Sequence, residues 1–142
     1  MTLKKRRAEG VLVDTDADLS PNPLNLGAKY AKLLTIRARN WASAAKAGAG
    51  TDTGVKIEIT DNNGDVVYLD ASDRDYATAE VTINPTQDDT ATGLNVVPTD
   101  ATGAASSAGT GAPIVLESPV RVAILNGSTA TDFMTVDLIV EV

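Results

Sequence analysis

The stretch VKIEITDNNGDVVYLD, residues 55–70, decides the fold class. Val55, Ile57 and Ile59 are apolar, and the residues between them are polar. Such alternation is typical of a β-strand with one buried face, because successive side chains of a strand point to opposite sides. The letters DNNGD that follow are turn residues, so the stretch predicts a β-hairpin.

The length of the hairpin loop sets which side chains face each other. A three-residue loop, residues 62–64, gives Gly64 the left-handed conformation that closes such a hairpin. It also places Ile57 opposite Leu69, apolar against apolar. A two-residue turn would instead place Glu58 opposite Leu69. The pairing therefore favours the three-residue loop.

The same letters allow a second interpretation, a calcium loop. Asp61, Asn63 and Asp65 stand at alternate positions, as the first oxygen ligands of such a loop do. A helix–loop–helix calcium site needs glycine at loop position six and glutamate at position twelve, where this chain has Val66 and Ser72. The flanking segments are also β in character. We favour the turn, with a weak surface calcium site as the alternative.

Residues 30–45 fit two templates. Apolar spacings of three and four residues, from Tyr30 to Ala45, match a helix. The alternation of Leu34, Ile36 and Ala38 with polar residues matches a strand. We favour the strand, because the chain after residue 50 has β patterns and an added strand pairs with them.

Apolar alternation returns near the C-terminus, at Val120, Val122, Ile124, Met134, Val136, Leu138, Val140 and Val142. Short strands separated by turn residues predict an all-β fold, a single antiparallel β-sandwich of Ig-like or jelly-roll type over residues 29–142. Residues 86–112 are rich in Thr, Ala, Gly, Ser and Asp and predict a long flexible excursion. Residues 1–28 show no periodicity, so we expect an extended basic N-terminal arm with too few apolar residues to form a core.

The composition excludes most catalytic chemistry. The 142-residue chain has no cysteine and no histidine, which removes disulfides, thiolate nucleophiles, imidazole bases and zinc sites built from those ligands. Asp70, Asp73 and Asp75 surround Arg74 and could hold a cation or serve a carboxylate enzyme. Such an enzyme needs a pocket with two carboxylates at a fixed separation, and a solvated turn is the simpler interpretation. We expect no enzyme, no metal and no cofactor.

The net charge of −7 is unevenly distributed. Residues 1–46 carry nine basic and four acidic side chains, whereas residues 47–142 carry three and fifteen. The basic first segment could bind the acidic second segment of another copy, or a different acidic partner. The run at residues 4–7 is shorter than the roughly 6–10 phosphate contacts of an ordinary DNA binder and has no interleaved aromatic, so we expect no nucleic acid.

Targeting signals are also missing from the sequence. No stretch approaches the roughly 20 apolar residues that a membrane span needs. The basic N-terminus is followed by the acidic stretch VDTDADLSPNP, where a signal peptide has its apolar region. We therefore expect synthesis in the cytoplasm and no membrane partner.

The C-terminal segment SPVRVAILNGSTATDFMTVDLIVEV, residues 118–142, resembles the closing strands of small tailed-phage virion proteins. The plan of basic N-terminus, compact β-domain and small-residue excursion is similar to that of capsid decoration, or cement, proteins. The resemblance implies a virion protein without an active site. It also implies a trimer or dimer that sits on the exterior of an icosahedral capsid and bridges neighbouring capsomers by binding the major capsid protein. The rival is a carbohydrate- or calcium-binding β-sandwich module of a tail, fibre or surface protein, but the chain has few aromatic residues to stack on sugars.

Under the decoration hypothesis, basic and apolar residues of the first 39 positions would contact the capsid: Lys4, Lys5, Arg6, Arg7, Leu24, Leu26, Arg37 and Arg39. Apolar residues elsewhere would contact other subunits: Trp41, Leu94, Val96 and Val97. Simpler interpretations exist for both sets. The arginines could be a solvated strand face, the single tryptophan a core anchor, and the basic N-terminus a disordered tail.

Overall fold

The computed structural model describes residues 2–11, 17–43, 45–48, 50, 56–70, 81–83, 95–99, 114–125 and 132–142. Every regular element in these ranges is a β-strand, which confirms the predicted all-β class. The strands are β1 (Leu3–Val11), β2 (Ala17–Asp18), β3 (Tyr30–Trp41), β4 (Lys56–Thr60), β5 (Val66–Asp70), β6 (Val81–Ile83), β7 (Asn95–Thr99), β8 (Ile114–Glu117), β9 (Arg121–Leu125) and β10 (Phe133–Glu141).

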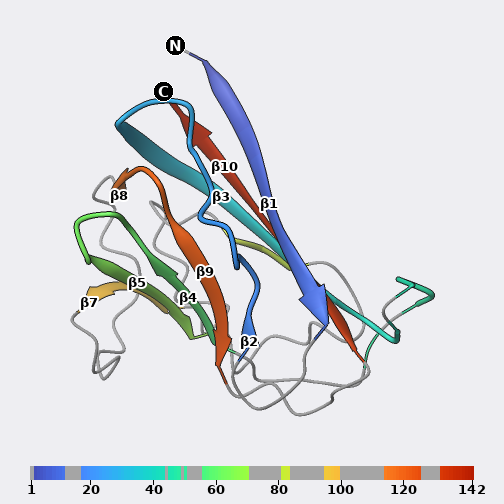
Figure 1. The fold of residues 1–142 in the computed structure, drawn as a ribbon. Coiled ribbons are helices and arrows are strands. Elements are labelled where there is room, and N and C mark those ends of the chain that lie inside the picture. Colours follow the sequence, from blue (N-terminus) through green and yellow to red (C-terminus); the bar gives the residue numbers. More distant parts are fainter. Residues whose placement is uncertain are drawn as a thin grey trace.

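The strands form two antiparallel sheets of five strands each. Sheet A has the order β1-β10-β3-β6, and β8 pairs with another part of β3. Sheet B has the order β2-β9-β4-β5-β7. In Figure 1, β1, β10 and β3 run side by side in one layer, and β9, β4 and β5 lie in another. The two ends of the chain lie together, because Thr2 and Val142 exchange both backbone hydrogen bonds, at 2.9 and 3.0 Å.

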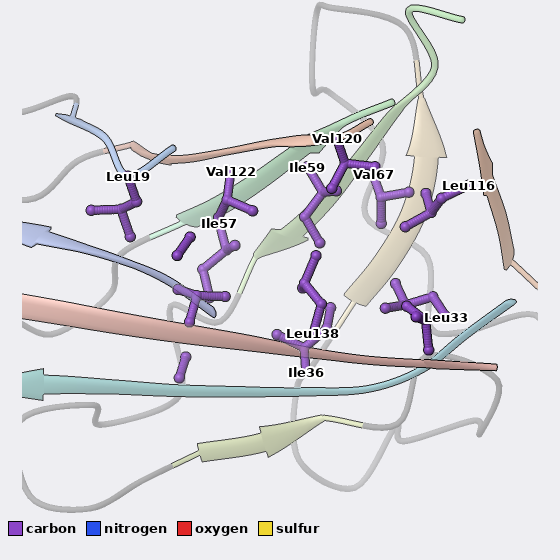
Figure 2. Close-up of a cluster of buried hydrophobic side chains, with 14 of the residues drawn as sticks. Leu19, Leu33, Ile36, Ile57, Ile59, Val67, Leu116, Val120, Val122 and Leu138 are labelled. Atoms are coloured by element: carbon purple, nitrogen blue, oxygen red, sulfur yellow. The ribbon is translucent and has the colours of Figure 1, made fainter. Parts of the chain in front are cut away.

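The apolar core is built from the facing sides of both sheets. Figure 2 shows Ile36 and Leu138 of sheet A directed toward Ile57 and Ile59 of sheet B. All four of these side chains are fully buried. Alternation along β4, β9, β10 and residues 36–41 of β3 therefore works as predicted, with one side of each strand in the core.

The hairpin of β4 and β5 has the predicted register. Ile57 lies opposite Leu69 and Ile59 opposite Val67. Gly64 has a φ of 88°, the left-handed conformation expected at this position of a three-residue loop, and its N–H donates to the carbonyl of Asp61 at 3.0 Å. The turn interpretation of residues 60–70 is confirmed.

Residues 30–41 form a strand, as favoured, but the predicted phase is wrong at one end. Thr35 pairs with Ile139, whereas Leu33 pairs with Val140, so Leu34 is an extra residue in β3. This β-bulge reverses the alternation before it. Leu33 is fully buried in the core, and Leu34 is only half-buried. Alternation alone had placed Leu34 on the buried side.

The N-terminal arm expected over residues 1–28 is corrected for most of its length. Residues 3–11 form β1, which pairs with β10 along all nine positions. Ala8, Leu19 and Leu26 belong to the core, at 2, 3 and 0% exposed. The sequence hid this strand because β1 lies at the border of sheet A, where basic side chains occupy positions that are apolar in a central strand.

The predicted excursion at residues 86–112 is described only in part. Residues 95–99 form β7, which pairs with β5 at the border of sheet B. A short strand at this place agrees with the apolar letters LNVV in the sequence. The rest of the excursion lies outside the described residues, as do Asp73 and Asp75.

Leu26 offers a direct test of the corrected N-terminus. The variant Leu26→Ala should lower the free energy of unfolding by about 2–5 kcal/mol, because it leaves a cavity among fully buried side chains. Leu3→Ala is the matched control and should change it by less than about 0.5 kcal/mol, since Leu3 is 63% exposed. Chemical denaturation of both variants measures the difference. Equal, small effects would show that residues 17–28 are not part of the core.

Candidate functional site

The side of sheet A that faces away from sheet B collects most of the described basic side chains. Alternate residues of β1, β10 and β3 lie on this side, since the residues between them enter the core. Across the strands, Arg7 pairs with Asp137 and Asp137 with Arg37. We call this surface the basic face. It holds Lys5, Arg7, Lys32, Arg37, Arg39 and Lys46, with the acids Glu9, Asp137 and Glu141 among them.

An ion pair lies near the centre of the basic face. The guanidinium of Arg7 donates from Nε to Asp137 Oδ1 at 2.7 Å and from Nη2 to Oδ2 at 2.8 Å. The side chain of Asp137 is 7% exposed and that of Arg7 is 45% exposed. The hydrogen bonds from Arg7 lower the pKa of Asp137, partial burial opposes them, and the charges of Arg7, Lys5 and Arg37 lower it further. Asp137 therefore stays ionised and offsets one of the surrounding cations.

Arg39 and Trp41 form a second contact on the basic face. The guanidinium carbon of Arg39 lies 3.6 Å from the centroid of the Trp41 ring, a cation–π distance. The indole Nε1 of Trp41 donates to Thr135 Oγ1 at 3.2 Å, which fixes the ring on the sheet. Among the described residues Nε of Arg39 is buried without a hydrogen-bond partner, so the ring is the main described contact of this charge.

Lys46 extends the basic face beyond the end of β3. Its Nζ lies 2.7 Å from Glu9 Oε2 and 5.0 Å from the centroid of the Phe133 ring. The face then has six basic and three acidic side chains among the described residues, an excess of three positive charges. Because the strands are paired in a sheet, these charges are held on a rigid support.

The structure divides the predicted capsid-contact residues between two sides of the sheet. Lys5, Arg7, Arg37, Arg39 and also Trp41 share the basic face. Their sequence positions are far apart, and only the pairing of β1 and β3 with β10 brings them together.

Lys4 and Arg6 occupy the opposite side of β1. Arg6 Nε donates to the carbonyl of Asn25 at 2.7 Å. Both side chains lie against Gly27, at 3.6 Å from the place where a Cβ of that residue would stand. The basic run is therefore split by the alternation of the strand, and only half of it belongs to the basic face.

The apolar contact residues also separate. Leu26 is in the core and does not reach a partner surface. Leu24 is half-buried, and its backbone N–H donates to the carbonyl of Val120 at 2.8 Å. Val96 and Val97 are in β7, on the other sheet, and Leu94 lies outside the described residues.

Sequence reasoning missed four contributors to this surface: Lys32, Lys46, Phe133 and Asp137. A signal existed for one of them. Asp137 is an acid in the middle of the apolar alternation of the C-terminal strand, and a charge at such a place needs a partner. The other three could not be assigned to a face without the strand order.

The oxygens proposed for a calcium site already have partners. Asp61 Oδ1 accepts from the N–H groups of Asn63 and Asp65 at 3.0 and 2.9 Å, and Oδ2 accepts from Glu117 N–H at 3.0 Å. Asp61 is 6% exposed, so its carboxylate closes the turn and ties it to β8. Within the described part of the chain, no three acidic side chains converge as metal ligands.

Comparison of the chain with protein-family models, with curated proteins and with solved structures finds no match. Among the described residues, no helix has the length and apolar character required to cross a membrane. The function of the chain is therefore inferred from the geometry of the basic face.

The role of Asp61 in closing the turn can be tested by Asp61→Asn. The amide keeps one acceptor oxygen but presents N–H groups to the backbone N–H of Glu117, leaving a partly buried donor unpaired. The free energy of unfolding should fall by about 1–3 kcal/mol. Asp65→Asn, at an exposed position of the same turn, is the control and should cost less than about 0.5 kcal/mol. A rise in stability of the native chain with calcium would instead favour the metal site.

The ion pair of Arg7 and Asp137 predicts a pH-dependent stability. The folded-state pKa of Asp137 is lowered from 3.8. The ionised carboxylate therefore contributes its full share to the free energy of unfolding above that value, and this stabilisation is lost as pH falls through the folded-state pKa. Asp137→Asn should cost about 1 kcal/mol at neutral pH, because Arg7 is partly exposed, and less below about pH 4. Chemical denaturation of Asp137→Asn, of Arg7→Gln and of the double variant gives the coupling free energy between the two side chains. If the two single variants lowered the free energy of unfolding additively at neutral pH, the ion pair would not contribute to stability.

Proposed function

We propose that this chain is a non-enzymatic structural protein of a phage virion, a capsid decoration protein that binds the outer surface of the major capsid protein and bridges neighbouring capsomers. The basic face of sheet A carries this proposal. It places Lys5, Arg7, Arg37 and Arg39 on one rigid surface, together with Trp41. The four cations are among the residues predicted to contact the capsid, and Trp41 is one of those predicted to contact other subunits.

We also propose that the two sheets form one β-sandwich. The shared core, with Ile36 and Leu138 facing Ile57 and Ile59, supports this arrangement. A sandwich has two outer surfaces, and here they differ in charge. Among the few described outward side chains of sheet B, Arg121 stands beside Glu58 and Thr60. One surface is thus suited to an acidic partner and the other is left to face solvent.

An acidic protein surface fits the basic face better than a small ligand does. Exposed Lys and Arg side chains steer an acidic partner and fix its orientation, while each exposed contact contributes little energy. A repeated lattice of binding positions compensates, because copies that also touch one another bind with a raised effective concentration. This is the situation of a protein that covers a symmetric shell.

The rival carbohydrate- or calcium-binding module receives less support. A sugar would stack on an open aromatic face, but Arg39 already covers one face of the Trp41 ring at 3.6 Å. The carboxylate of Asp61, the first proposed calcium ligand, is occupied by three backbone N–H donors. The surface geometry favours an extended acidic partner over either ligand.

The decoration role predicts that binding to capsids depends on the basic face. Capsid shells of the source phage, assembled without this chain, should bind it in co-sedimentation, and binding should weaken as salt rises. The double variant Arg37→Glu and Arg39→Glu should bind at least about tenfold more weakly, since two contacts become repulsive.

The control for this experiment is Arg121→Glu, which makes one such charge reversal at an exposed position of sheet B. It should bind like the native chain. Quantitative mass spectrometry of purified virions supplies a second readout. We expect the copy number of this chain to be in simple proportion to that of the major capsid protein. Absence of the chain from virions would overturn the proposal. So would the finding that the chain binds duplex DNA, a polysaccharide or calcium instead of the capsid surface.

A further inference from the structure

Strand β1 leaves one side of its backbone turned outward at the border of sheet A. Thr2 and Val142 exchange both backbone hydrogen bonds. Hydrogen-bonded pairs alternate with non-hydrogen-bonded pairs along antiparallel strands, so every second residue of β1, counted from Thr2, exchanges backbone hydrogen bonds with β10. The N–H and C=O groups of Leu3, Lys5, Arg7, Glu9 and Val11 consequently point away from β10. Within the described ranges, no strand pairs with this side of β1.

The other borders of the two sheets are blunted in ways that prevent further pairing. Strand β2 has two residues, β6 has three and β8 has four. Strand β7 contains Pro98, which lacks an N–H group. Strand β1 differs from them all, because it has nine residues, no proline and an uninterrupted register against β10. Short length, proline, bulges and charged side chains are the usual protections of an edge strand, and β1 has only the charges.

We propose that β1 pairs with β1 of a second copy of this chain, antiparallel, about a two-fold axis at Arg7. The pairs would be Leu3 with Val11, Lys5 with Glu9, and Arg7 with itself. All of these residues direct their backbone groups to the open side, so each pair can exchange two hydrogen bonds once the carbonyl of Lys5, which accepts from Arg6 Nη1 at 3.2 Å in the single copy, turns to the partner strand. The interface is isologous, as a two-fold dimer requires.

The side chains support this register over its neighbours. Leu3 and Val11 are two of the few large apolar residues that are exposed, at 63 and 37%, and the pairing brings them together. Each Lys5 meets a Glu9, whose carboxylate also binds Lys46 of its own copy, and opposite charges across a ladder are stabilising. A shift by two residues toward the N-terminus would place Lys5 opposite Arg7, which is repulsive. A shift the other way would set Arg7, already bound to Asp137, opposite Glu9 and would separate Leu3 from Val11.

Two features bear on the charges at the centre of the pair. Arg7 would stand opposite its own copy, but each guanidinium is already bound to Asp137 by two short hydrogen bonds. On the other side of the strand, alternation places Lys4 opposite Gly10 and Arg6 opposite Ala8, so no further cations face each other. Four basic residues in β1 therefore need not prevent the pairing, as they would in other registers.

The dimer would change the size of the basic face. A two-fold axis perpendicular to the sheet keeps the outward sides of both copies on one side. The two basic faces would then join across β1 into a single surface. This inference rests on β1 alone and does not require the capsid role, since any partner that bound one basic face would meet two.

The test uses the full chain in sedimentation equilibrium over a concentration series, without capsids. The native chain should form a reversible dimer. Lys5→Glu places glutamate opposite Glu9 twice, and Glu9→Lys places lysine opposite Lys5 twice. Each variant alone should dimerise about tenfold to a hundredfold more weakly. An equimolar mixture of the two should restore native affinity, because both pairs in the mixed dimer are again of opposite charge.

Lys29→Glu is the control, with the same charge change at an exposed position outside β1, and it should dimerise like the native chain. Thermal melts confirm that all variants are folded, as expected for exposed sites. A native chain that stays monomeric or forms a trimer would overturn the proposal, since this interface closes with two copies. Single variants with native affinity, or a mixture that fails to recover it, would overturn it equally.

Discussion

The pairing of β10 with strands on both of its sides is the constraint on which sheet A depends. Its hydrogen bonds to β1 and β3 join the beginning and the end of the chain and fix which residues face inward. Met134, Val136, Leu138 and Val140 enter the core, so Asp137 and its neighbours must face out. A slip of one residue would exchange these two sets, burying a charge and exposing the core.

This register makes the basic face a consequence of the fold. Two segments that are distant in sequence, β1 and β3, contribute the strand cations, and the pairing of both with β10 places them in rows across the sheet. Their mutual repulsion is reduced by Asp137, which has Arg7 on one side and Arg37 on the other. A single buried acid thus allows several cations to stand on one side of a sheet.

Part of this structure could be predicted from sequence, where alternation and turn chemistry agree. The hairpin is the clearest case, because Gly64 and the apolar pairs point to the same register. Residues 3–11 could not be predicted, since a border strand needs no apolar alternation of its own. The bulge at Leu34 was equally hidden, because an extra residue is defined only against its partner strand. The basic face required the strand order, which local patterns do not contain.

The separation of inner and outer side chains has a consequence for how this protein could be changed. Core residues such as Leu138 determine stability, whereas Arg37 and Lys5 face out and contribute little to it. Surface charge can then vary without loss of the fold, which suits a protein that must match a partner. Asp137 is the exception, because its carboxylate is buried within the outer surface and holds Arg7 in place. A change at Asp137, or at Arg7 that binds it, alters stability and surface charge together.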